Sequence, residues 1–462
     1  MKAVLLIDFG STYTKVTAVD LESEQLLGTA AAYTTVQTDI NDGLRCALQQ
    51  LETATGPLEF AERYACSSAA GGLRMITSGL VPELTAEAAK LASLGAGAKI
   101  LKVYSYQLTE DDLEEIEAAR PEILLLVGGT DGGNSACILH NAKMLAQSKE
   151  KFPVIIAGNR SVGRQCQRIL EGRETYLVAN VMPRFGELNI EPAQEKIREL
   201  FLERIIQAKG LSQASELISG IMMPTPSAMM AAMRLLAEGF EEEKGIGELL
   251  GIDVGGATTD IYSIASGMPA KANVVYKGLP EPYVKRTVEG DIGMRYSIHG
   301  IVDAAGIGRV AQLSGLTEGR AEELVEYLSR QTDTLPQNSE LEALDFALAS
   351  LAVETAVSRH AGRLEEVYTP TGLAYAQTGK DLSGVDQIVV TGGSLIHTRR
   401  TGQIAAHALY DPAHPESLRP KKARILVDRK YILAAMGLLS QHAPGTALRI
   451  MKKELVRDGA EE

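Results

Sequence analysis

Several features that would assign the chain to a common class are missing from its sequence. It has four cysteines, Cys46, Cys66, Cys137 and Cys166, and none forms a Cys-x-x-Cys pair, so neither a zinc site nor a disulfide framework is expected. No apolar run approaches the ~20 residues needed to cross a bilayer, so we expect no membrane span. Only a short apolar run precedes Asp8, and no small-residue cleavage site follows it, so we expect no signal peptide and a cytoplasmic protein.

Strongly basic stretches are also missing. The formal net charge is −13, with 46 Lys and Arg against 59 Asp and Glu. Such a surface repels polyanions unless a local basic patch overcomes the repulsion. The richest candidates, Arg419 to Arg424 and the pair Lys452 and Lys453, are short and bracketed by acids. We therefore expect no binding to nucleic acid.

The length and an internal repeat predict two lobes. At 462 residues the chain exceeds what one hydrophobic core usually serves. A strand, an acidic tight turn and a second strand occur near Asp8 and again near Asp253, half a chain apart. This spacing indicates a duplicated domain, because solenoid repeats recur every ~20 to 50 residues. We predict one lobe over residues 1–245 and a second over residues 246–462.

Apolar periodicity predicts an α/β fold with parallel pairing in part of the chain. The expected strands are Ala3 to Ile7, Tyr13 to Asp20, Glu122 to Val127, Pro153 to Ala157, Glu248 to Ile252, Ile261 to Ile264 and Asp386 to Val390. The expected helices are Ser135 to Ser148, Glu191 to Ala208, Ser227 to Phe240, Thr317 to Ser329 and Ser339 to Leu364.

The first acidic turn has the residue types of a phosphate loop. Its sequence is Asp8-Phe9-Gly10-Ser11-Thr12-Tyr13-Thr14-Lys15. Gly10 allows a tight turn close to an anion, backbone N–H groups and the Ser11 and Thr12 hydroxyls can donate to phosphate, and Lys15 adds positive charge. Asp8, at the end of a strand, is placed to hold Mg²⁺ through its waters. A β-hairpin turn with a polar cap would look the same.

A second acidic turn makes a phosphate loop the more specific interpretation of the first turn. Asp253-Val254-Gly255-Gly256-Ala257-Thr258-Thr259-Asp260 repeats the acid, the glycine at the same offset and the hydroxyls. Two such loops can bind a phosphate chain from opposite faces, with Asp8 and Asp253 sharing one metal and orienting a water for attack on the terminal phosphate. We therefore predict that Gly255, Gly256, Ala257, Thr258 and Thr259 contact the nucleotide.

A third element follows the last predicted strand, where Thr391 precedes Gly392, Gly393 and Ser394. Glycines there let the backbone lie flat against an adenine or ribose. In this order, the three elements resemble the phosphate-1, phosphate-2 and adenosine motifs of the sugar kinase, heat-shock-70 and actin superfamily. That resemblance implies two actin-like (ribonuclease H-like) lobes, each with a mixed five-stranded sheet flanked by helices, and ATP in the cleft between them. Neither a Rossmann nor a P-loop glycine motif is present.

Other segments narrow the resemblance to one family. Leu124 to Asn134, Val154 to Asn159 and Val288 to Arg295 are similar to segments of the glutamate mutase L family, and the resemblance covers nearly the whole chain. The family implies an ATP-driven chaperone that frees an adenosylcobalamin-dependent aminomutase, such as glutamate mutase or ornithine aminomutase, of damaged cobalamin. The chain has no Asp-x-His-x-x-Gly cobalamin-ligand motif of its own. A homo-oligomer is left open.

Three further acids have two interpretations each. Asp131, in a glycine-rich turn, is either a catalytic acid that positions the attacking water or the polar residue of an Asx turn. Glu289 and Asp291 either face the cleft or cap a helix beginning near Ile292, and we favour capping.

Two other functions remain open for the whole chain. One is a small-molecule kinase of the same fold with a carboxylate or sugar acceptor. The other is an actin-like filament-forming ATPase.

Overall fold

The computed structural model describes residues 2–10, 12–34, 40–68, 73–208, 221–269, 273–369 and 372–458. The chain divides into two compact units. Unit 1 comprises Met1–Met229 with Gly278–Pro280, and unit 2 comprises Met230–Lys277 with Glu281–Glu462. The division falls within helix α8 (Thr225–Glu238).

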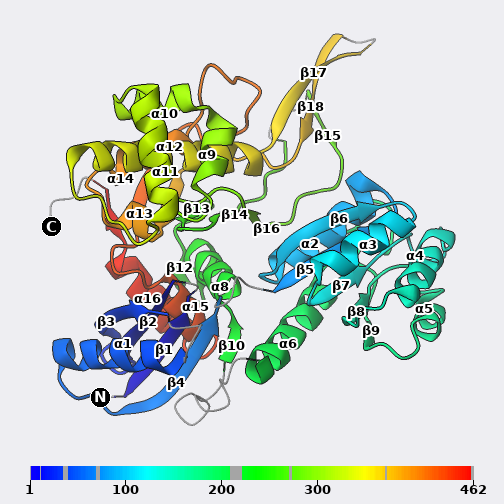
Figure 1. The fold of residues 1–462 in the computed structure, drawn as a ribbon, viewed down its shortest axis with the longest axis horizontal. Coiled ribbons are helices and arrows are strands. Elements are labelled where there is room, and N and C mark those ends of the chain that lie inside the picture. Colours follow the sequence, from blue (N-terminus) through cyan, green and yellow to red (C-terminus); the bar gives the residue numbers. More distant parts are fainter. Residues whose placement is uncertain are drawn as a thin grey trace. The chain divides into compact units, whose positions relative to one another are not determined.

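Unit 1 contains a mixed five-stranded sheet built around its first strand. In order, its strands are β3 (Gln25–Tyr33), β2 (Tyr13–Asp20), β1 (Ala3–Phe9), β4 (Phe60–Ser67) and β10 (Ile221–Pro224). The first three are antiparallel neighbours, whereas β4 and β10 run parallel to β1. Every residue of β1 is buried, and α1 (Ile40–Thr55) lies against β2 and β3 (Figure 1).

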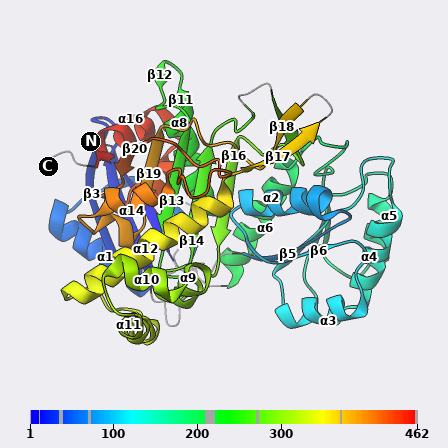
Figure 2. The same cartoon turned by 90° about the horizontal axis from the view of Figure 1, so that it is seen from above.

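A second sheet of unit 1 is wholly parallel. Its strands are, in order, β6 (Lys99–Ser105), β5 (Arg74–Gly79), β7 (Ile123–Leu126), β8 (Val154–Ile156) and β9 (Thr175–Leu177). Helices α2 (Glu87–Gly95) and α6 (Glu191–Ala208) pack on one face, and α3 (Glu110–Ala119), α4 (Ala136–Gln147) and α5 (Gly163–Ile169) lie on the other (Figures 1 and 2). The predicted parallel pairing of the segments near 123 and 154 is confirmed.

Unit 2 repeats the arrangement of the first sheet. The order is β16 (Val284–Glu289), β14 (Thr259–Ile264), β13 (Leu249–Val254), β19 (Gln387–Thr391) and β20 (Arg424–Val427), with β21 (Val456–Arg457) as a sixth strand. Again the first three strands are antiparallel and the next two are parallel to the central one. The predicted α/β fold with two actin-like lobes is therefore confirmed. A separate three-stranded sheet contains β15 (Val274–Lys277), β18 (Gly372–Thr378) and β17 (Arg363–Thr369).

The core of unit 2 is organised by α12 (Ser339–His360), which is buried over most of its length. It packs against α9 (Ile298–Ala305), α10 (Ile307–Ser314), β13 and β14. The helix was predicted to continue to Leu364, but it ends at His360. Ala361 already has extended backbone, and the N–H of Gly362 donates to the carbonyl of Lys380 at 2.7 Å, which starts β17 instead. Among the described helices, none is long and apolar enough to span a membrane.

Candidate functional site

The first acidic turn joins β1 and β2. Asp8 lies opposite Lys15 in this antiparallel pair. The N–H of Gly10 donates to the carbonyl of Tyr13 at 3.1 Å, and a Cβ at Gly10 would lie 2.5 Å from that oxygen, so only glycine fits. The carbonyl of Thr12 accepts from the N–H of Thr34 at 2.8 Å. The turn is thus held on both sides, and Ser11 lies outside the described residues.

The carboxylate of Asp8 is almost fully buried, with 5% of the residue exposed. Its Oδ1 accepts a hydrogen bond of 2.6 Å from the hydroxyl of Thr225, and the thiol of Cys66 lies 3.5 Å from the same oxygen. The ammonium of Lys15 lies 3.5 Å from Oδ2. The carboxylate is therefore oriented from two sides before any ligand binds.

Three parallel strands bring these groups together. β1, β4 and β10 end at the same edge of the sheet, so Asp8, Cys66 and the residue that follows Pro224 become neighbours. Burial, reinforced by the charge of Asp8, raises the pKa of the Cys66 thiol well above its ordinary value, so this thiol stays protonated. The sequence analysis missed both Thr225 and Cys66. The available signal for Thr225 was its place between a short apolar run and a helix.

The second acidic turn repeats the geometry of the first. It joins β13 and β14, and the N–H of Gly255 donates to the carbonyl of Thr258 at 2.9 Å. The offsets from Asp253 are the same as those from Asp8 to Gly10 and Tyr13. Here, however, the residue opposite Asp253 is Asp260.

A following segment holds the second turn through its backbone. The N–H groups of Met294 and Arg295 donate to the carbonyls of Gly255 and Gly256 at 3.0 and 2.9 Å. The hydroxyl of Thr259 is buried and donates to the carbonyl of Ile292 at 3.0 Å, so it supports this segment. Gly256, Ala257 and Thr258 are half-buried residues, and the Thr258 hydroxyl donates to Asp260 at 3.2 Å.

Arg286, in β16, compensates the negative charge of Asp260. The guanidinium of Arg286 donates to Asp260 Oδ1 at 2.8 Å from Nε, and its Nη2 lies 2.6 Å from the same atom. Burial disfavours the charge on Arg286, but Asp260 outweighs burial and raises the pKa of Arg286 above its ordinary value. This ion pair keeps Asp260 from adding a free negative charge next to Asp253.

The predicted adenosine motif lies directly beside Asp253. Strand β19 is parallel to β13, with Thr391 opposite Asp253. Gly392 has φ +95°, and a Cβ there would lie 2.7 Å from Asp253 Oδ1 and 2.7 Å from the N of Val254, so no other residue fits. Gly393 is exposed with open space around its Cβ position, and Ser394 is half-buried in the short helix α13 (Gly393–Ile396). The second acidic turn and the predicted adenosine motif, which are distant in sequence, are therefore neighbours in the structure.

Asp131 lies at the carboxyl edge of the all-parallel sheet, a different sheet from that of Asp8. Its Oδ1 accepts from the N–H of Arg160 and from the side-chain amide of Asn180, both at 3.0 Å, and the guanidinium of Arg160 lies 3.5 Å from Oδ2. None of these described partners belongs to either acidic turn. The contacts tie together three loops, and the catalytic role of Asp131 stays a prediction.

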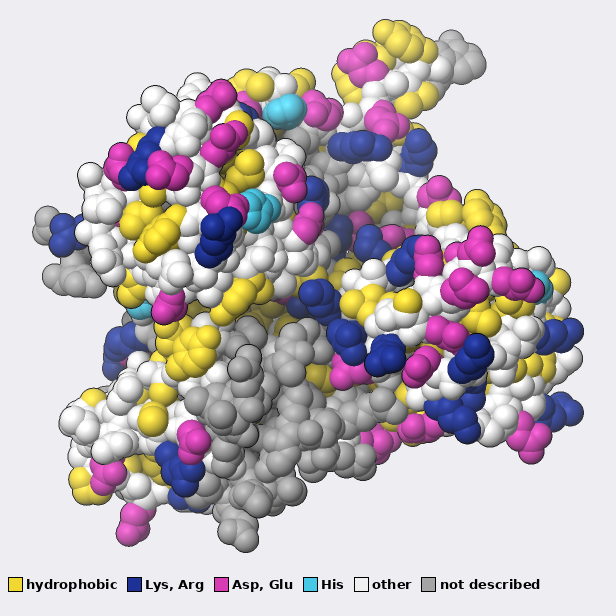
Figure 3. All heavy atoms as spheres, in the orientation of Figure 1, with side chains coloured by type: hydrophobic (Ala, Val, Ile, Leu, Met, Phe, Trp, Pro, Cys, Tyr) yellow, Lys and Arg dark blue, Asp and Glu magenta, His cyan; other side chains and the backbone are white. Residues whose placement is uncertain are grey.

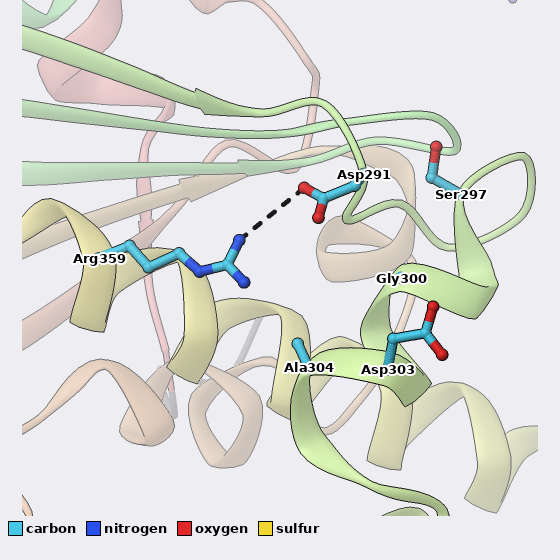
Figure 4. A pocket seen from close by; sticks show the side chains of 6 residues that line it. All are labelled: Asp291, Ser297, Gly300, Asp303, Ala304 and Arg359. Carbon is cyan, nitrogen blue, oxygen red and sulfur yellow. Dashed lines mark ion pairs between the residues drawn. The ribbon is translucent and has the colours of Figure 1, made fainter.

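Glu289 and Asp291 do not cap a helix, because α9 begins only at Ile298. That prediction was wrong. Both acids instead pair with Arg359 of α12, and the ion pair of Asp291 and Arg359 spans 3.8 Å. Figure 4 shows these two side chains facing each other across a shallow pocket of unit 2. The pocket is lined by Asp291, Ser297, Gly300, Asp303, Ala304 and Arg359.

The chain is similar to one known protein family and to several solved structures. The family model described as MutL protein matches residues 4–455. Protein MutL from Clostridium tetanomorphum is 47% identical over 461 residues, covering 99% of this chain and 100% of the relative. Among solved structures, similarity is found to a diol dehydratase-reactivating factor (TM-score 0.36, 12% identity, covering 96% of this chain and 99% of the other). It is also found to a xylulose kinase from Lactobacillus acidophilus (TM-score 0.36, 10% identity, 99% and 93%).

The match to the MutL protein family is long enough to assign the chain to that family. It spans nearly the whole chain, and the alignment with the clostridial relative covers both units. The resemblance predicted from the sequence motifs is confirmed. The chain belongs to the MutL protein family.

Proposed function

We propose that this protein is an ATP-hydrolysing reactivating factor for an adenosylcobalamin-dependent aminomutase of the glutamate mutase or ornithine aminomutase type. In this role it promotes the release of damaged cobalamin so that intact cofactor can rebind. The observation that carries the proposal is the match to the MutL family across both units, in a chain that presents the same acidic turn twice. We place its action in the cytoplasm, together with its mutase.

The residues of the two turns are the ones that we propose to bind the nucleotide. Gly10 and Gly392 keep backbone free of side chains next to Asp8 and Asp253, where a Cβ would collide with protein atoms. Exposed Gly393 and half-buried Ser394 are the proposed contacts to the adenosine, and the proposed contacts to the phosphates are Thr12, Lys15, Gly255, Gly256, Ala257 and Thr258. The prediction that Thr259 also contacts the nucleotide is corrected, because its buried hydroxyl donates to Ile292. When bound, Mg-ATP would supply the phosphoanhydride bond that is hydrolysed.

Magnesium would be held by Asp8 and Asp253. No group of three His, Cys, Asp or Glu side chains within the described ranges could hold a metal ion. This suits Mg²⁺, which keeps several waters and binds through one or two carboxylates and the phosphates. Thr225 and Lys15 would hold the Asp8 carboxylate in the orientation that the metal-bound water needs.

Two assays test the proposal together. The first measures ATP hydrolysis with and without candidate sugar and carboxylate acceptors. The second inactivates the mutase with hydroxocobalamin, adds this protein with Mg-ATP and adenosylcobalamin, and follows the return of mutase activity. We expect hydrolysis without any acceptor, and recovery of the mutase that requires ATP. A phosphorylated small-molecule product without recovery of the mutase would show that the protein is a small-molecule kinase instead. An increase in light scattering with ATP would show that it forms filaments instead.

A further inference from the structure

Unit 1 carries an arginine-rich surface at one edge of its all-parallel sheet. The surface consists of Arg160, Arg164, Arg168, Arg184 and Phe185, which we call the arginine face. Arg160 follows β8, Arg164 and Arg168 lie in α5, and Arg184 and Phe185 lie in a turn after β9. Lys and Arg side chains also gather over α4 and α5 in the space-filling view (Figure 3).

These side chains point into solvent. The side chains of Arg160 and Arg184 are 82% and 83% exposed, and Phe185 is 79% exposed. An exposed aromatic ring beside cations gains free energy if a partner covers it. Aromatic residues and arginine are the residue types enriched at the centres of protein interfaces.

Asp131 fixes the two parts of the arginine face against each other. It accepts from the N–H of Arg160 at 3.0 Å, and its own N–H donates to the carbonyl of Pro183 at 3.0 Å. The turn that presents Phe185 is closed by the N–H of Glu187, which donates to the carbonyl of Arg184 at 3.1 Å. A surface held by such contacts is ordered before a partner arrives, which lowers the entropic cost of binding.

Helix α5 presents two of the arginines to solvent, and one of them, Arg164, lies where the helix dipole disfavours it. Arg164 and Arg168 are four residues apart and share one side of the helix. Arg164 occupies the first turn, where a positive charge is unfavourable because the helix dipole is positive at that end. Within the described ranges neither makes a salt bridge, whereas Arg160 pairs with Asp131 and Arg184 with Glu187, each at 3.5 Å.

We propose that the arginine face docks an acidic protein surface, and that this surface belongs to the mutase; the naming of the partner rests on the proposed function. The chain as a whole is acidic, with a formal net charge of −13, so its surface attracts an acidic partner only where cations are concentrated. Charge complementarity therefore both steers the partner and sets its orientation. The exposed Phe185 would supply the apolar anchor in the centre of the contact.

The test compares two double charge reversals in the full-length protein. Arg164→Glu with Arg168→Glu alters the arginine face. Lys149→Glu with Lys151→Glu makes the same change in charge at exposed lysines that precede β8, at the opposite edge of the same sheet. Binding to purified glutamate mutase, to ornithine aminomutase and to a duplex DNA is measured by titration at low and high salt. Melting temperature and ATP hydrolysis report whether each variant is folded and active.

We expect the arginine reversal to weaken mutase binding by at least about 10-fold, the lysine reversal to change it little, and Phe185→Ala to weaken it about 10-fold. High salt should weaken mutase binding by the wild type more than mutase binding by the arginine variant. If a mutase binds the wild type and both reversals equally well, the docking face is wrong while the proposed function stands. If neither mutase binds the wild type, both proposals fail, and tighter binding of DNA than of either mutase overturns the choice of partner.

Discussion

The two acidic turns share one backbone geometry but differ in what surrounds the acid. Asp8 faces Lys15 across its strand pair and accepts from Thr225, whereas Asp253 faces Asp260, whose charge Arg286 compensates, and lies beside Gly392. At the first turn, side chains from neighbouring elements orient the carboxylate in addition to the backbone bonds of the turn. The second is held by backbone bonds from the segment that contains Met294. A duplicated motif thus keeps its turn and its acid while the way in which the acid is fixed diverges.

The largest effect should come from removing either acid. Asp8→Asn and Asp253→Asn should each lower the rate of ATP hydrolysis by about 10²-fold or more, because each removes a charge that we assign to the metal. Steady-state phosphate release measures this effect, and circular dichroism checks the fold. A wild-type rate in one variant would mean that only the other turn takes part in catalysis.

Gly392→Ala should have the next largest effect. Its Cβ would lie 2.7 Å from Asp253 Oδ1 in a residue with φ +95°, so the backbone must shift at the second turn. We expect ATP affinity to fall about 10-fold and unfolding to become easier by about 1 to 3 kcal/mol. Gly393→Ala is the matched control, because nothing surrounds its Cβ position. If the two substitutions lowered ATP affinity equally, the close approach of Gly392 to Asp253 would not matter for nucleotide binding.

Thr225→Val probes the hydrogen bond that orients the acid of the first turn. It keeps the shape but removes the hydrogen bond of 2.6 Å to Asp8, and bonds to charged groups contribute about 1.5 to 3 kcal/mol. Hydrolysis should slow about 10-fold and recover in Thr225→Ser. Thr258→Val removes the bond to Asp260 together with a proposed phosphate contact, and we expect it to slow hydrolysis less because neither bond holds the carboxylate assigned to the metal. Measured kcat and KM would contradict the comparison if Thr258→Val proved the more damaging.

The smallest effect concerns the pH dependence of stability, and its sign should differ between the two units. Burial, followed by repulsion from Lys285, lowers the pKa of Lys380 to about 7, and its ammonium donates to the carbonyl of Ser263 in β14 at 3.3 Å. An unfolded lysine has a pKa of about 10.4. Between these values the unfolded state binds more protons, so the free energy of unfolding of wild-type unit 2 rises with pH. Lys380→Met should remove this rise.

Cys66, next to Asp8, has the opposite effect on the pH dependence of the free energy of unfolding. Its pKa is raised by burial, so above the unfolded thiol pKa of about 8.5 the folded state keeps a proton that the unfolded state loses. The free energy of unfolding of unit 1 therefore falls as the pH rises beyond that value. Calorimetry of the wild type, Lys380→Met and Cys66→Ala at neutral and alkaline pH separates the two contributions. Identical pH profiles for all three proteins would contradict both.

Local pattern predicted the elements that carry the turns. The bounds of β2 and α6 agree with those predicted, because strand alternation and helical charge patterning are properties of consecutive residues. The two acidic turns and the glycine pair could be located for the same reason. The end of α12 was misplaced, since the alanine-rich pattern continues past His360 while the contact of Gly362 with Lys380 comes from a distant strand.

The surroundings of the acids could not be predicted in the same way. Cys66 and Thr225 reach Asp8 only because β1, β4 and β10 end at one edge of a sheet, and β4 and β10 carry little signal of their own. Similarly, the approach of Gly392 to Asp253 depends on the pairing of β13 with β19. Such contacts require the topology, which no window of the sequence contains.

The central claim is that both turns serve a single nucleotide. Isothermal titration of the wild-type protein with a non-hydrolysable ATP analogue and magnesium tests it most directly. The account predicts one nucleotide bound per chain. Two independent nucleotides per chain, or no binding at all, would contradict it.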